Sequence, residues 1–200
     1  WAFLRARPGL LSLQLFYCAT YFFGAVLMAL STPYLLALVD AETGGVLLTL
    51  SGLGMLVGVA IVSVVRWRWP RAWSILALEG LGGACLLAMG LARAPALLTV
   101  FAAVFLAQMS ISNGLSQALW QEAVPLGLQV RVFALRRMIA WASFPVSFLV
   151  AGPAADELAA AMGDRARGIA AVFLVAGLGK LCVSLLFLRG RLRELDATSG

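Results

Sequence analysis

Long apolar runs separated by short polar breaks dominate the chain. A helix that crosses an apolar bilayer core of about 30 Å needs roughly 20 residues at 1.5 Å each. Runs of this kind predict six spans, at about residues 9–38, 44–65, 72–92, 95–119, 134–155 and 168–188. Apolar and polar positions do not alternate in any run, so the strands of a lipid-facing barrel are not expected. The pattern predicts an all-α polytopic membrane protein with residues 1–200 in one six-helix bundle.

The composition supports lipid as the solvent. Hydrophobic residues make up 62% of the chain and charged residues 12%, and the mean hydropathy is +0.98. That is more apolar surface than a water-soluble domain buries. The chain has no His, and we find no paired intramembrane carboxylates and no Gly-x-Ser-x-Gly element. We therefore expect neither an enzyme nor a metal site.

Basic residues cluster in the breaks that fall on one side if six helices alternate. Eleven arginines lie on this side and only three on the other. The eleven are Arg5, Arg7, Arg66, Arg68, Arg71, Arg131, Arg136, Arg137, Arg189, Arg191 and Arg193. Such asymmetry marks the cytoplasmic side, so both ends of the chain are predicted to be cytoplasmic. The net charge of +6 then reflects topology, and no nucleic-acid partner is expected.

Small residues and prolines predict where helices touch and bend. Gly54 and Gly58 form a GxxxG step in the second span, and Gly80 and Ala84 repeat the spacing in the third. Both steps predict close helix contacts. Pro145 removes a backbone donor in the fifth span and predicts a bend there. The chain begins at Trp1 without an initiating Met or a signal-peptide pattern, so we expect it to be part of a longer protein.

The most specific signal lies between residues 116 and 156. It consists of Ser-Gln-Ala-Leu-Trp-Gln at 116–121, Val-Pro at 124–125, Leu-Gln at 128–129, Arg-Val-Phe at 131–133, Arg-Arg-Met at 136–138 and Ala-Gly-Pro-Ala-Ala-Asp at 151–156. This stretch resembles the run that joins the tenth and eleventh helices in the drug- and siderophore-exporting branch of the major facilitator superfamily, which includes macrolide-efflux permeases. Val130 departs from the family pattern, where Gly precedes the Arg-Val pair.

The resemblance implies that the chain is the C-terminal six-helix half of a bacterial inner-membrane efflux permease. Its partners would be an N-terminal six-helix half, membrane lipid and a small amphipathic organic substrate. Export would proceed by alternating access, with no cofactor and with the transmembrane proton gradient as the expected driving force. The alternative, an autonomous six-helix scaffold or assembly subunit, is disfavoured by the motif match.

A basic segment follows Pro125 and is interpreted as a cytoplasmic loop containing a helix that lies on the membrane surface. Its candidate functional residues are Gln129, Arg131, Arg136 and Arg137. The arginines either hold anionic lipid or brace the two halves of the transporter in one conformation.

Polar stripes on the first and fourth spans are the candidate substrate site, because in the resembling family these helices line the central cavity. Helical spacing places the members of each stripe on one face. They are Gln14, Tyr17 and Tyr21, with Cys18, on the first span and Ser110, Asn113 and Gln117 on the fourth. Met28 or Met109 is expected beside them. Hydrogen bonding between helices is the alternative role, since bare amides are costly in hydrocarbon.

Two ionisable residues, Glu79 and Lys180, lie deep inside the third and sixth spans. A charge at this depth needs a partner or a water-filled path. Counted from the arginines at the ends of their spans, they lie about 12 and about 13.5 Å from the same edge. Because the depths match, we predict a structural ion pair; a role in proton or substrate coupling and separate solvation are the alternatives.

Overall fold

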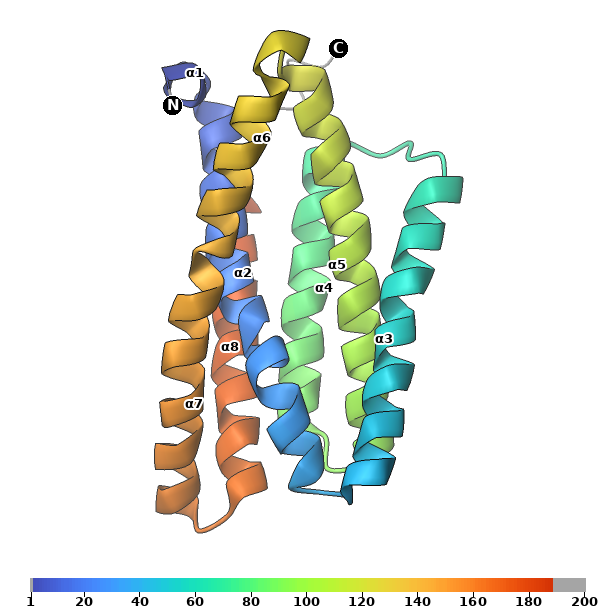
Figure 1. Cartoon of the computed structure of the whole chain (residues 1–200), viewed down its shortest axis with the longest axis vertical. Coiled ribbons are helices and arrows are strands. Elements are labelled where there is room, and N and C mark those ends of the chain that lie inside the picture. Colours follow the sequence, from blue (N-terminus) through green and yellow to red (C-terminus); the bar gives the residue numbers. More distant parts are fainter. Residues whose placement is uncertain (1, 189–200) are drawn as a thin grey trace.

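The computed structural model describes residues 2–188 and consists of helices joined by short connections (Figure 1). The helices are α1 (Ala2–Arg5), α2 (Pro8–Leu36), α3 (Ala41–Val64), α4 (Arg71–Leu91), α5 (Pro95–Ala123), α6 (Leu126–Trp141), α7 (Ser143–Met162) and α8 (Arg165–Leu188). With α6 and α7 taken as one run, six segments of this described part are long and apolar enough to cross a membrane. The chain is therefore an all-α multi-pass membrane protein, which confirms the predicted fold class.

Local chemistry in the breaks sets the helix ends. Asp40 caps α3 by accepting the backbone N–H of Thr43 at 3.0 Å and its hydroxyl at 2.8 Å. These hydrogen bonds, the backbone one first, hold the pKa of Asp40 below its ordinary value. Pro95 occupies the first turn of α5, where its missing N–H is not needed. Gly163 ends α7 with a φ of 65°, the left-handed conformation that favours glycine.

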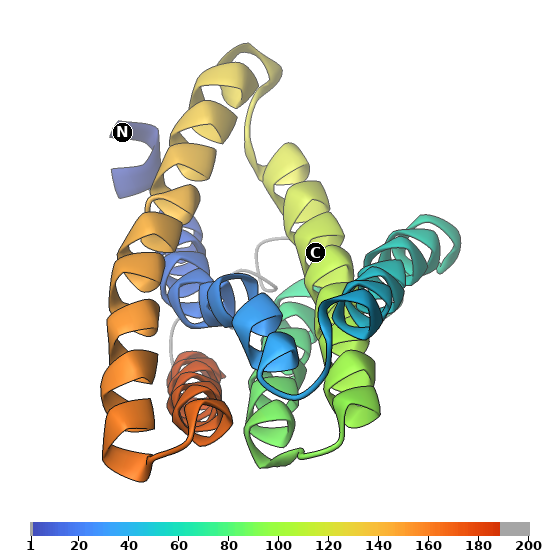
Figure 2. The same ribbon diagram turned by 60° about the horizontal axis from the view of Figure 1, so that its bottom comes forward.

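The helices form two groups with the same pattern of neighbours. In one group α2 packs against α8 and against α6–α7; in the other α5 packs against α4 and against α3. Helices α4 and α8 pack against each other and join the groups. Exchanging α2 with α5, α3 with α6–α7 and α4 with α8 reproduces these contacts. The match is incomplete, because α7 also packs against α8, whereas α3 and α4 make no comparable contact within the described residues. Because α2 and α5 run in opposite directions, the two groups are inverted relative to each other (Figures 1 and 2).

Small side chains make the contacts of α3 and α7. The residues that α3 buries are Gly44, Ser51, Gly54 and Gly58, and those that α7 buries are Ser143, Ser147, Ala151 and Ala155. A Cβ added to Gly54 or Gly58 would overlap the backbone of Ala103 or Ala107 on α5. The predicted GxxxG step therefore is a close helix contact. The two glycines let the backbones of α3 and α5 approach closely and gain dispersion energy. This contribution matters in lipid, where the hydrophobic effect does not drive helices together.

The second predicted small-residue step, Gly80 and Ala84, is not where α4 makes its close contact. Ala84 is exposed, and Gly80 meets no atom nearer than the Ser184 Cβ at 4.0 Å. The α4–α8 contact is made one residue away from Ala84, where a Cβ on Gly83 would lie 3.1 Å from the Gly177 carbonyl oxygen and one on Gly177 would lie 2.9 Å from that of Gly83. Spacing alone does not give the rotation of a helix. Here the face that carries Glu79 and Gly83 turns towards α8.

The segment that follows Pro125 does not lie flat on the membrane surface as expected. Gln129, Arg131, Arg136 and Arg137 belong to α6, which continues into α7 as one run from Leu126 to Met162 (Figure 1). Helix α6 packs against α2 and stands along the bundle, because polar contacts from α2 and α5 hold it there. Within this run the helix is interrupted at Ala142, between α6 and α7. Pro145 explains the interruption, because proline has no N–H to donate to the Trp141 carbonyl.

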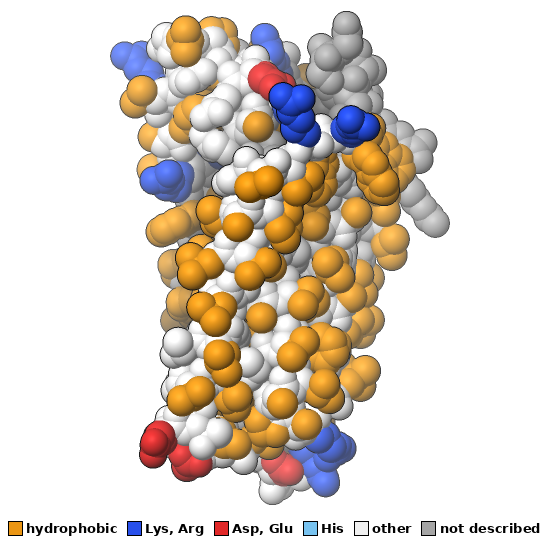
Figure 3. Space-filling model, turned by 90° about the vertical axis from the view of Figure 1, so that its right-hand side faces the viewer, with side chains coloured by type: hydrophobic (Ala, Val, Ile, Leu, Met, Phe, Trp, Pro, Cys, Tyr) orange, Lys and Arg blue, Asp and Glu red, His pale blue; other side chains and the backbone are white. Residues whose placement is uncertain are grey.

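Charged side chains lie at the two ends of the bundle on the face formed around α3, and apolar side chains cover the middle (Figure 3). Exposed apolar residues of α3 include Val46, Leu50, Leu53, Leu56 and Val64. An apolar belt between charged ends is the surface that a lipid bilayer requires. Arg189, Arg191 and Arg193, predicted at the arginine-rich end, lie outside the described residues.

Candidate functional site

An ion pair between Glu79 of α4 and Lys180 of α8 lies in the interior of the bundle. The ammonium contacts one carboxylate oxygen of Glu79, and both side chains are 2% exposed. Lys180 also donates to the Thr20 carbonyl of α2 at 3.4 Å and lies 5.6 Å from the ring centre of Phe105. The structure thus places the two predicted residues in contact. The sequence predicted this pairing from the matching depths of the two residues, and the packing of α4 against α8 brings them together.

The ion pair continues into a hydrogen-bonded chain. The Ser112 hydroxyl of α5 donates to the second carboxylate oxygen of Glu79 at 2.6 Å. The Tyr17 hydroxyl of α2 lies 2.9 Å from the Ser112 Oγ, and it donates to the Ser112 carbonyl at 3.0 Å. Four helices therefore meet at one buried polar cluster, which we call the polar core: Tyr17, Glu79, Ser112 and Lys180. Shared hydrogen bonds reduce the cost of burying the charges.

Gln108 extends the polar core without a partner of its own. Its side chain is buried, and within residues 2–188 neither its amide nitrogen nor its amide oxygen has a hydrogen-bond partner. A Cβ built on Gly82 would lie 3.1 Å from the Gln108 Cδ and 2.8 Å from the Lys180 Cε, so both side chains cover Gly82. Gln108 and Ser112 were not among the residues predicted for the site. Their signal was a second polar stripe on α5, with Gln108, Ser112 and Ser116 at four-residue intervals.

The six candidate cavity residues divide into a buried and an open set. Gln14, Tyr17 and Ser110 are buried. Gln14 donates to the Arg136 carbonyl at 3.0 Å, and Ser110 donates to the Leu106 carbonyl of its own helix at 3.1 Å. The Gln14 bond joins α2 to α6 and matches the alternative role in hydrogen bonding between helices, whereas the Ser110 bond stays within α5.

The other three candidates reach the surface. Tyr21 of α2 donates to the Asn113 side-chain oxygen of α5, and both residues are partly exposed. Gln117 is exposed and accepts a hydrogen bond from Arg136 at 3.0 Å. We call Tyr21, Asn113 and Gln117 the open polar face. Its residues come from α2 and α5, the two helices that occupy equivalent positions in the two groups.

Arg136 ties α6 to α5 beside this face. Its guanidinium donates to the Ser116 hydroxyl at 2.6 Å and lies 5.1 Å from the Trp120 ring centre. Gln129 has a different role: its amide donates to the carbonyls of Gln121 and Val124 at 3.2 and 3.1 Å. Those carbonyls end α5, so Gln129 caps that helix. The expected lipid contact and bracing of two halves stay predictions for the exposed Arg131 and Arg137.

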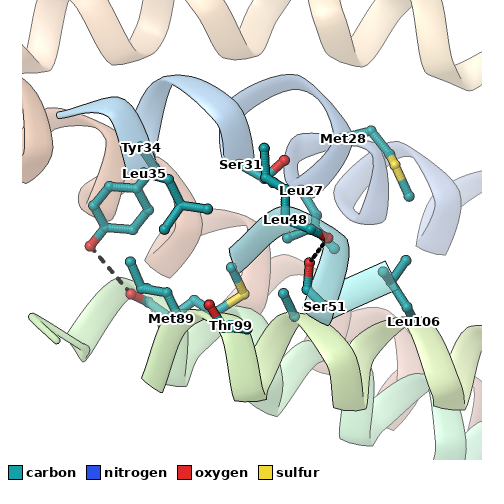
Figure 4. Close-up of a pocket in the computed structure, with 12 residues that line it drawn as sticks. Leu27, Met28, Ser31, Tyr34, Leu35, Leu48, Ser51, Met89, Thr99 and Leu106 are labelled. Carbon is teal, nitrogen blue, oxygen red and sulfur yellow. Dashed lines mark hydrogen bonds between the residues drawn. The ribbon is translucent and has the colours of Figure 1, made fainter. Parts of the chain in front are cut away.

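A pocket lies towards the opposite end of the bundle between α2, α3, α4 and α5 (Figure 4). Its volume is about 160 Å³. The residues that line it are Leu27, Met28, Ser31, Tyr34, Leu35, Leu48, Ser51, Met89, Leu98, Thr99, Ala102 and Leu106. Met28 was expected near the substrate, but none of the six polar candidates lines this pocket.

Within residues 2–188, no three His, Cys, Asp or Glu side chains are placed to hold a metal ion. Comparison with known proteins adds no identity, since no family model, curated protein or solved structure matches the chain.

Proposed function

We propose that the chain is one six-helix half of a secondary active transporter that exports small amphipathic organic compounds by alternating access. The other half would be an N-terminal bundle of the same protein, and a transmembrane proton gradient would drive the export. The site of action would be a bacterial inner membrane, with the arginine-rich end of the bundle in the cytoplasm.

The observation that carries this proposal is the internal inversion of the bundle. In each group a central helix, α2 or α5, packs against corresponding partners, and the two groups run in opposite directions. Such inverted three-helix repeats are typical of transporter halves. The inversion makes α2 and α5 equivalent, and these two helices supply Tyr21, Asn113 and Gln117. Polar side chains that stay open at this depth favour a water-filled or substrate-filled path over lipid.

The chemistry of the open polar face supports a particular substrate class. Tyr21 and Asn113 supply a hydroxyl and an amide without a fixed charge, and apolar residues such as Met28 flank them on the same helices. The nearby Arg136 guanidinium is already bonded to Gln117 and Ser116. Such a surface suits an uncharged polar group on a lipophilic molecule. Within the described residues, Glu79 is the one carboxylate deep in a span, and Lys180 pairs with it. We therefore assign the proton-carrying carboxylate to the partner half.

Replacing Asn113 or Gln117 by Leu is expected to lower export about twofold to tenfold, because each variant loses hydrogen bonds worth roughly 0.5–1.5 kcal/mol to the substrate. The measurement is export from cells or vesicles at equal protein level. Ser63→Ala is the control, since Ser63 is exposed on α3 and its hydroxyl bonds only its own helix, at Val59. Equal export by all three variants would contradict the proposed site and assign the two amides to helix packing.

Reporter fusions test the orientation of the bundle. Fusions after Arg71, Gln129 and Arg193 are expected to report a cytoplasmic position, and fusions near Glu42 and Gly163 an external one, because arginine-rich loops stay inside. The measurement is the activity of a reporter that works on one side only. An external signal at Gln129 would overturn the six-span topology.

A further inference from the structure

The pocket between α2, α3, α4 and α5 has apolar walls and an open rim. Leu98, Met89 and Ala102 form buried parts of its wall, whereas Met28 at the rim is 45% exposed. No charged residue lines it. The thioether side chains of Met28 and Met89 adapt to ligands of different shape (Figure 4).

Three of the four hydroxyl groups in the wall, those of Tyr34, Ser51 and Thr99, already donate their protons within the protein. The Ser51 hydroxyl donates to the Leu48 carbonyl at 2.7 Å, and Thr99 donates to the Pro95 carbonyl at 3.1 Å. Tyr34 directs its hydroxyl away from the pocket to the backbone of α4, at the Ala92 carbonyl 3.2 Å away. A ligand in this pocket therefore meets mainly apolar surface and one hydroxyl at the partly exposed rim, that of Ser31, which has no hydrogen bond among the described residues. With no charged group in the wall, the pocket disfavours a charged or strongly polar ligand group.

Helical register connects the pocket to the open polar face. Met28 follows Tyr21 by seven residues on α2, and Leu106 precedes Asn113 by seven residues on α5. Seven residues are close to two turns, so each pocket residue shares a face with its polar partner at a distance of about 10.5 Å. Tyr21 and Met28 therefore lie on the same face of α2, and Asn113 and Leu106 lie on the same face of α5.

We propose that this pocket binds a neutral lipophilic group of about one aromatic ring, at one end of an amphipathic substrate whose polar end meets Tyr21 and Asn113. The proposal rests on the proposed transport function and specifies its substrate. The volume of about 160 Å³ is similar to that of a protein cavity of roughly 150 Å³ that binds benzene. A compact ring fills this space better than a flexible acyl chain does.

The test uses a photoreactive amphiphile with one phenyl-diazirine ring and an uncharged hydroxyl-amide end about 10 Å away, two helical turns. The protein that carries this chain is reconstituted in nanodiscs, labelled and mapped by mass spectrometry. We expect labels on Met28, Met89 and Leu106. An excess of the same amphiphile without the diazirine should reduce this labelling, because it competes for the pocket.

Two filling variants with matched controls locate the site. Ala102→Phe fills the pocket from α5, and Ser31→Phe fills it from the partly exposed rim on α2, so a folding defect of the first leaves the second informative. Both are expected to lower the labelling about tenfold, a loss of about 1.4 kcal/mol. Val104→Phe and Thr32→Phe are the controls, since both positions are exposed and lie outside the pocket.

The outcomes separate the pocket from the transport function. Labels confined to lipid-facing residues such as Leu56, or equal labelling in the filling variants and their controls, would overturn the pocket proposal and point to lipid. Loss of export in Asn113→Leu together with an unlabelled pocket would overturn the pocket alone. Competed labelling of the pocket in a protein that exports nothing would support the pocket and overturn the transport function.

Discussion

Glu79→Gln or Lys180→Met alone is expected to lower the free energy of unfolding by about 3–5 kcal/mol, because either change strands a buried charge. Glu79→Gln leaves the ammonium with neutral acceptors, such as the Thr20 carbonyl, and without a counter-charge, and Lys180→Met leaves the carboxylate with Ser112. The double variant removes both charges and should be much less destabilised. The measurement is unfolding of the purified protein in detergent or bilayer, combined in a double-mutant cycle.

Arg71 and Glu122 supply the matched control. They pair across α4 and α5 at the arginine-rich end, where their side chains are 36% and 62% exposed. The same cycle on this pair should give about 0.2–1 kcal/mol, since solvent screens it. Coupling at Glu79 and Lys180 no larger than this would contradict a structural role. A double variant that folds but does not export would place the pair in the transport mechanism instead.

Gly54→Ala is expected to destabilise the bundle by about 1–3 kcal/mol or more, because the added methyl overlaps the backbone of α5. The new Cβ would lie 2.6 Å from the Ala103 carbonyl carbon and 2.7 Å from its Cα, and backbone atoms have no rotamer through which to withdraw. Helices α3 and α5 must then separate. The measurement is the yield of folded, monodisperse protein together with its unfolding midpoint.

Gly52→Ala is the control on the same helix. No atom lies within 4 Å of a Cβ built on Gly52, so this change should be neutral or stabilise α3 by about 0.5–1 kcal/mol through its higher helix propensity. Both variants make the same Gly-to-Ala change, at positions two residues apart on α3. Equal stability of both would show that α3 does not pack on α5 through Gly54.

Hydropathy was sufficient to predict most of the fold because lipid offers no hydrogen bonds to the backbone. Each apolar run therefore has to be a helix, and its ends fall where polar residues begin. The predicted first and third spans, 9–38 and 72–92, lie within two residues of α2 and α4. The predicted fifth span, 134–155, lies inside the run Leu126–Met162 but is too short. The arginines of α6 interrupt the apolar pattern, although the backbone of α6 continues into α7.

Within the candidate site, the sequence was informative about depth but not about neighbours. Helical spacing put Tyr17 and Tyr21 on one face, but the structure turns Tyr17 to the buried Ser112 and Tyr21 to the partly open Asn113. A stripe in the sequence states which residues share a face. It does not state how that face is rotated towards its neighbours.

The sequence by itself determined the number of spans, their alternation and the depth of Glu79 and Lys180, since each follows from local hydropathy and the 1.5 Å rise of a helix. Only the tertiary structure decided that Gly83 and not Ala84 meets α8, that Gln108 and Ser112 border the ion pair, and that a pocket lies two turns from Tyr21. These features depend on helix rotation and crossing, which arise from the packing of side chains distant in sequence.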